Sequence, residues 1–85
     1  MRLRDADLSW REIDGELILL DLRSSTYLAS NASGSVLIKH LVEDRTMGEL
    51  AQALVDAFGI PPAQARNDAE DFLAELERSG MLEGS

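Results

Sequence analysis

The pattern of apolar and polar residues in the first third of the chain predicts three short strands. Leu8–Ile13 and Glu16–Leu22 have the length and apolar content of strands. Asp14-Gly15 between them is a strong hairpin signal, because both residue types tolerate positive φ. Ser25–Ser30 follows a polar turn and is predicted to be the third strand of an antiparallel sheet.

The third strand is the candidate functional surface. Alternation along the strand places Leu28 on one face as a core candidate. It places Tyr27 on the other, where the ring is either at the solvent rim or one wall of a slot. If no strand pairs with the outer side, free N–H and C=O groups can accept an added peptide strand. The residues predicted to bind a peptide along this edge are Ser25, Thr26, Tyr27, Leu28 and Ala29.

Two helical patterns follow this strand. Asn31 is predicted to cap a first helix that runs to residue 42 or 43, with the small pair Gly34-Ser35 permitting close approach to the sheet. Thr46 and Glu49 form a capping box at the start of a second helix. The predicted apolar stripe of this second helix, which Gly59 ends, is Met47, Leu50, Leu54 and Phe58.

A third helix is predicted from Pro62 to Arg78 or Ser79, because proline is favoured in a first helical turn and Gly80 stops the pattern. Its predicted inner face comprises Ala65, Ala69, Phe72, Leu73 and Leu76. The apolar Met81-Leu82 is expected to fold back onto the body. Three strands followed by three helices indicate an α+β fold.

One stripe of the third helix is a candidate for binding the added peptide. Ala65, Asp68, Phe72 and Glu75 follow one another at steps of three or four residues. Leu76 lies four residues after Phe72, so all five are expected to share a face. We expect Ala65, Phe72 and Leu76 to line an apolar slot beside the edge strand. Asp68 and Glu75 are expected to contact polar or basic atoms of the peptide. The alternative is that Phe72 and Leu76 are ordinary core residues.

Length and charge limit the possible functions. The 85 residues fit one domain, in which residues 1–7 and 83–85 are expected to be poorly ordered. The formal net charge of −8 and the scattered basic residues argue against nucleic acid as a partner. No apolar run approaches a membrane span, and the charged N-terminal residues do not resemble a signal sequence. We therefore expect a soluble cytoplasmic protein without a membrane partner.

Catalytic and metal-binding patterns are missing from the sequence. There is no cysteine, and His40 is the single histidine, so we expect no thiol chemistry and no metal site. His40 is better explained as a packed or surface residue than as a catalytic base. No glycine-rich phosphate loop occurs, and Ser35 lacks the sequence context of a carrier-protein attachment site. We predict a protein that is not an enzyme and uses no cofactor.

An ordered set of residues along the chain carries a family resemblance. The set comprises Gly15 to Asp21, Tyr27-Leu28, Asn31, Gly34-Ser35, Leu41, Glu43-Asp44, Thr46, Glu49 to Ala51, Leu54, Phe58, Asp68, Phe72-Leu73, Leu76 and Gly80 to Leu82. It resembles the PqqD-like family, whose members are precursor recognition elements (RREs) of ribosomally made and post-translationally modified peptides (RiPPs). The similarity covers about Leu8 to Glu83 and is strongest to the leader-binding half of a split lasso-peptide B protein.

The resemblance implies a winged-helix-like fold and a role in lasso-peptide (RiPP) biosynthesis. It implies that the leader of a precursor peptide, with a Tyr-x-x-Pro motif, pairs with the third strand beside the third helix. A leader peptidase or other modifying enzyme is the implied partner. The sequence departs from the common pattern at Ile38, where an aromatic residue is frequent, and at Ala69, where a larger aliphatic residue is usual. A small Ala69 either deepens the groove or fits this core.

Two other function classes remain open from the sequence. A winged-helix regulator would bind DNA, and its affinity would fall steeply with salt, whereas strand addition would respond modestly. A purely structural subunit would bind its partner protein equally well without any leader.

Overall fold

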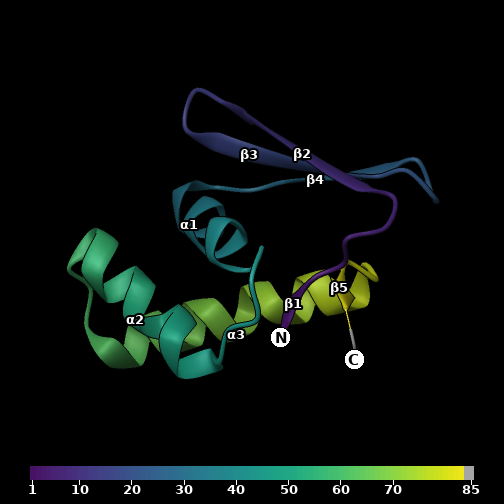
Figure 1. Cartoon of the computed structure of the whole chain (residues 1–85). Helices are drawn as coiled ribbons and strands as arrows, with labels where there is room; N and C mark the ends of the chain where they lie inside the picture. Colours follow the sequence, from purple (N-terminus) through teal and green to yellow (C-terminus); the bar gives the residue numbers. More distant parts are fainter. Residues whose placement is uncertain (84–85) are drawn as a thin grey trace.

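The computed structural model describes residues 1–83, which form an α+β fold of three helices and two small sheets (Figure 1). The elements in chain order are β1 (Arg2–Leu3), β2 (Leu8–Ile13), β3 (Glu16–Asp21), β4 (Thr26–Ala29), α1 (Ala32–His40), α2 (Met47–Phe58), α3 (Pro62–Arg78) and β5 (Leu82–Glu83). The predicted order of three strands followed by three helices is confirmed, and the structure adds the short β1 and β5.

The main sheet has the strand order β2-β3-β4 and is antiparallel throughout. Asp14 and Gly15, with φ values of 51° and 82°, make the predicted hairpin turn. β4 is shorter than the predicted Ser25–Ser30, because Ser25 has a φ of 56°, which belongs to a turn and not to a strand. Ser30 leaves the strand but still donates its N–H to the carbonyl of Leu17 at 2.8 Å.

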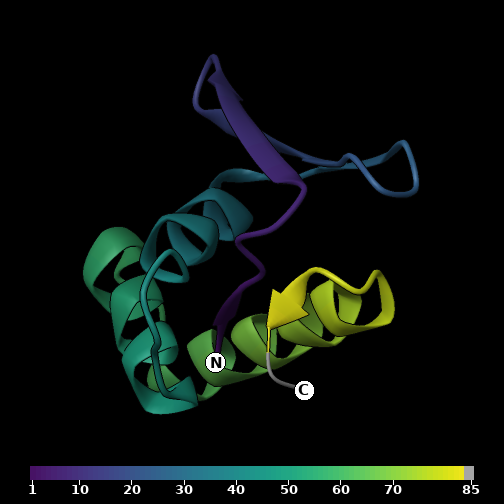
Figure 2. The ribbon, with the colours of Figure 1, turned by 45° about the vertical axis from the view of Figure 1, so that its right-hand side comes forward.

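The helices lie on one side of this sheet, with α1 between the sheet and the pair α2 and α3 (Figures 1 and 2). The run of four apolar residues in β3 therefore meets two environments. Leu17 and Leu19 are fully buried under α1, whereas Ile18 is half-buried and Leu20 is 37% exposed on the outer face. Within residues 1–83, no helix covers this outer face.

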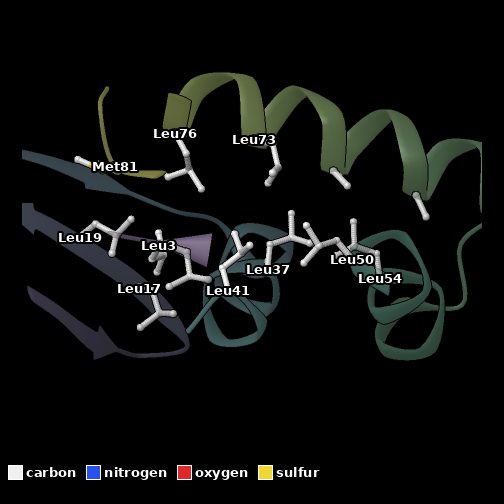
Figure 3. Packing of buried hydrophobic residues seen from close by; sticks show 13 residues of the cluster. Leu3, Leu17, Leu19, Leu37, Leu41, Leu50, Leu54, Leu73, Leu76 and Met81 are labelled. Carbon is white, nitrogen blue, oxygen red and sulfur yellow. The ribbon is translucent and has the colours of Figure 1, made fainter. Parts of the chain in front are cut away.

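One hydrophobic core joins the sheet to all three helices. Leu73 and Leu76 point from α3 toward the interior, where they meet leucines of α1 and β3 (Figure 3). Met81 is also buried, which confirms that the segment after α3 folds back. The buried cluster consists of Leu3, Leu17, Leu19, Leu37, Ile38, Leu41, Leu50, Leu54, Ala65, Ala69, Leu73, Leu76 and Met81.

Local signals place the helix starts where the sequence predicts them. Asn31 accepts a hydrogen bond from the N–H of Gly34 at 2.9 Å, and Thr46 and Glu49 form the complete capping box. The first helix ends at His40, earlier than predicted. The carbonyl of Leu41 instead accepts the N–H of Leu3 at 2.9 Å, so a strand takes the place of the next helical turn.

Residues 1–7, for which the sequence predicts poor order, make specific contacts with the rest of the fold in the structure. Leu3 is 4% exposed and β1 pairs with β5. Arg4 forms an ion pair with Asp21 of β3 at 2.7 Å and donates to the carbonyl of Gly80 at 2.6 Å, so it joins the sheet to the end of α3. Glu83 lies in β5, whereas residues 84 and 85 lie outside the described residues.

None of the described helices combines the length and the apolar composition that crossing a membrane requires.

Candidate peptide-binding site

β4 is an edge strand, because within residues 1–83 it pairs only with β3. The Ser30 N–H points to β3, and alternate residues of an antiparallel strand direct their N–H and C=O groups to opposite sides. Tyr27 and Ala29 therefore direct their backbone groups to the open edge, and Leu28 directs its groups to β3. The predicted edge is present, and two of its residues carry the free donors and acceptors.

A hollow of about 290 Å³ lies where β4 passes into α1 and α1 meets α3. We call it the α1–α3 hollow. It continues past Asp68 into a second hollow of about 330 Å³ near Phe58 and Ile60. The residues that line the α1–α3 hollow are Asn31, Ser33, Gly34 and Leu37 on the α1 side, and Asp68, Asp71, Phe72 and Glu75 on the α3 side.

The rim of this hollow is acidic. In the part of the chain that the structure describes, Asp68, Asp71 and Glu75 form no ion pair and no side-chain hydrogen bond. Asp21 shows the opposite arrangement, because a hydrogen bond from Arg4 holds the pKa of its carboxyl below the ordinary value. The three rim carboxylates are therefore available to a guest cation or hydrogen-bond donor.

Two of the predicted slot residues, Ala65 and Leu76, do not line the hollow, and neither does Ala69, which is also among the residues predicted to bind the leader. All three are fully buried in the core of the structure and present no surface to a peptide. Ala69 fits this core and does not deepen the groove. Phe72 is half-buried and belongs to the hollow, as do the predicted Asp68 and Glu75.

The predicted residues of the edge strand lie on two faces. Tyr27 is 73% exposed on the outer face, where it lines a hollow with Ile18 and Leu20, so it is not a wall of a slot shared with α3. Leu28 is half-buried opposite Leu19, as expected for the inner face. Ser25, Thr26 and Ala29 are exposed.

Sequence reasoning missed five of the eight residues that line the hollow. Asp71 follows Asp68 by three residues and precedes Glu75 by four, so helical spacing was the signal that could have found it. Asn31 is predicted only as a helix cap, and Ser33 and Leu37 lie within the predicted first helix without a predicted site role. Gly34 was predicted to pack closely on the sheet, which it does at Ser30, but its contact with α3 had no signal in the sequence.

An α+β domain with a free strand edge beside a groove defines a class of peptide-binding folds. The profile described as "Coenzyme PQQ synthesis protein D (PqqD)" matches residues 16–82. The chain belongs to the PqqD family, as its sequence resemblance indicated. Proteins of this family are non-catalytic peptide-binding domains, and the chain is accordingly not an enzyme.

Two solved structures match nearly the whole chain. One is "TbiB1 in Complex with the TbiA(beta) Leader Peptide", with a TM-score of 0.88, 29% identity, and coverage of 100% of this chain and 98% of that one. The other is "Lasso peptide synthetase B1 complexed with the leader peptide", with a TM-score of 0.80, 26% identity, and coverage of 94% and 93%. A comparison with curated protein sequences found no match.

Proposed function

We propose that this protein is a non-catalytic adaptor that binds the leader of a ribosomal precursor peptide in lasso-peptide (RiPP) biosynthesis. The observation that carries the proposal is the free edge of β4 at a groove between α1 and α3. Support comes from two structures of similar fold that are described as complexes with leader peptides.

In the proposed binding mode, the leader adds a strand to β4. Tyr27 and Ala29 each offer one N–H and one C=O to the guest backbone. Each such hydrogen bond contributes only about 0.5–1.5 kcal/mol net, so backbone pairing by itself gives weak and unselective binding. Side chains of the guest that enter the α1–α3 hollow would supply the remaining affinity and the specificity.

The chemistry of the hollow fits a guest side chain that is both aromatic and a hydrogen-bond donor. Phe72 offers an apolar wall, and Asp68 and Glu75 offer acceptors at the rim. The tyrosine of a Tyr-x-x-Pro leader meets both conditions, since its ring can pack on Phe72 while its hydroxyl donates to a carboxylate. A basic guest residue would use the carboxylates and gain less from the ring.

The bound leader is then presented to a leader peptidase or another modifying enzyme. An adaptor that holds both partners raises the concentration of substrate at the enzyme without taking part in the chemistry. We expect this protein to increase the rate at which that enzyme processes the full precursor. Processing of a precursor without its leader should not respond.

Amide hydrogen exchange on the free protein and on its complex tests the binding mode. The probe is a synthetic leader peptide that carries a Tyr-x-x-Pro motif. Tyr27 and Ala29 amides should exchange fast in the free protein and become protected on binding. The Leu28 amide, which points to β3, serves as the internal control and should be protected in both states.

The binding mode and the adaptor function can be contradicted separately. If the leader binds without protecting Tyr27 and Ala29, strand addition to β4 is wrong. If no leader peptide of this type binds at all, the adaptor function is wrong.

A further inference from the structure

Gly34 occupies an unusual place for a glycine, because it lies inside the first turn of α1 and is buried. A glycine in a helix is intrinsically less favourable than alanine. Its N–H donates to the Asn31 side chain at 2.9 Å, a bond that any residue other than proline could make. Backbone conformation and capping therefore do not explain why this position lacks a side chain.

The surroundings of Gly34 supply the reason. A Cβ atom at this position would lie 2.9 Å from Cε1 and 3.2 Å from Cζ of Phe72, and 2.8 Å from Cβ of Ser30. Real Cβ atoms essentially never approach another heavy atom to within 3.0 Å, so a side chain at residue 34 requires a shift at both Ser30 and Phe72. The edge of the Phe72 ring thus rests directly on the backbone of α1.

Ser30 is held by several hydrogen bonds, so it can shift only slightly. It is 4% exposed, and both its N–H and its hydroxyl donate to the carbonyl of Leu17 at 2.8 Å. Its hydroxyl also lies 3.1 Å from that of Ser35, which accepts the N–H of Leu17 at 3.1 Å. These bonds fix the junction of β3, β4 and α1 at one point.

Phe72 is the neighbour that can move further. It is only partly buried, and it packs against a core that has little free volume. Its open side is the α1–α3 hollow, which Gly34 and Phe72 line together. A methyl group at residue 34 would therefore drive the ring into the hollow.

We infer that Gly34 is a positioning residue for peptide recognition, which keeps the hollow open by letting the Phe72 ring withdraw against α1. The inference rests on the proposed function, because it assigns the hollow to a side chain of the leader. Gly34 does not touch the guest in this account, and its effect passes through Phe72. Residue 34 thereby sets how large a guest side chain the hollow accepts.

The first test measures the ring without any leader. Phenylalanine-labelled protein contains two rings, Phe58 and Phe72, and their NMR signals are compared between the wild type and Gly34→Ala. The Phe72 signals should shift and those of Phe58 should stay. Unchanged Phe72 signals would overturn the inference, whatever the leader does.

The second test measures affinity for the same synthetic leader peptide with the Tyr-x-x-Pro motif. Gly34→Ala should weaken binding about tenfold, because one misplaced methyl group in a fitted pocket has an effect of this size. Gly48→Ala is the matched control, since Gly48 is also in the first turn of a helix but its Cβ would meet only Thr46 Oγ1 at 3.8 Å. The control should bind like the wild type.

The double variant Gly34→Ala/Phe72→Leu separates a positioning role from a folding defect. Leucine is shorter than phenylalanine, so the added methyl group should cause little further loss relative to Phe72→Leu by itself. If the double variant loses affinity or folding as Gly34→Ala does, the shift of Ser30 and not that of Phe72 causes the loss, and the inference is wrong. If the wild type binds no leader, the proposed function is wrong, and this inference, which rests on it, is wrong as well.

Discussion

Two neighbouring sides of α3 differ sharply although they consist of adjacent residues. Ala69, Leu73 and Leu76 are buried, whereas the residues that directly precede them, Asp68, Phe72 and Glu75, line the α1–α3 hollow. One residue turns a helix by about 100°, so each such step leads from the core to the groove. One helix can therefore support the fold and receive a guest, and substitutions on its two sides should have separable effects.

Leu76→Ala should give the largest effect, on the core side. Removing this fully buried side chain should lower the free energy of unfolding by about 2–5 kcal/mol, because contacts are lost and a cavity remains. Urea unfolding followed by circular dichroism measures this. Glu77→Ala changes the next, exposed residue and should stay within about 0.5 kcal/mol of the wild type. Equal losses in both variants would remove the distinction between the two sides.

Phe72→Ala should give the largest effect on the groove side. We expect affinity for the leader to fall about tenfold or more, as for an aromatic residue central to an interface. Fluorescence anisotropy with a labelled leader measures the affinity. Trp10→Ala is a suitable control, because Trp10 is 44% exposed on β2 at the opposite edge of the sheet. Unchanged affinity in Phe72→Ala would remove the hollow from the binding site.

Asp68→Asn should have a smaller effect on the same side. The substitution keeps the size of the side chain and removes its charge, and partly exposed charge pairs contribute only about 0.2–1 kcal/mol, so affinity should fall by about fivefold at most. The loss should shrink at high salt. Glu70→Gln is the control, because Glu70 pairs with Arg66 at 3.3 Å and does not line the hollow. If Glu70→Gln weakens binding as much as Asp68→Asn does, the loss of affinity comes from the net charge of the protein and not from the site.

The smallest effect concerns a carboxylate that belongs to the fold and not to the groove. The hydrogen bond from Arg4 lowers the pKa of Asp21 below its ordinary value, so the pair stabilises the folded state above that value. This contribution is lost as pH falls through the lowered pKa. Urea unfolding measured between about pH 6 and pH 2 gives the free energy of unfolding at each pH. This free energy should decrease less on acidification in Asp21→Asn than in the wild type. Parallel pH profiles would contradict this account.

The buried residues of α3 show where reasoning from sequence reached its limit. Helical spacing placed Ala65, Asp68, Phe72, Glu75 and Leu76 on one broad face. However, an apolar residue at the border of such a face suits a groove and a core equally well. Only the packing of the other elements on α3 settles the matter: the first turn of α1 lies against Phe72, whereas Ala65 and Leu76 are fully buried in the core. The sequence predicted the free edge of β4 more directly, because the third strand is followed by a helix.

The sequence by itself determined the three strands of the main sheet, the helix starts, the Asp14-Gly15 turn and the family. These features depend on local rules, namely side-chain period, capping and turn conformation, which act over a few residues. The tertiary structure decided the β1 and β5 pairing, the Arg4–Asp21 ion pair and the contact of Gly34 with Phe72. Those contacts join segments far apart in the chain, and their geometry depends on how whole elements pack, so no local pattern specifies them.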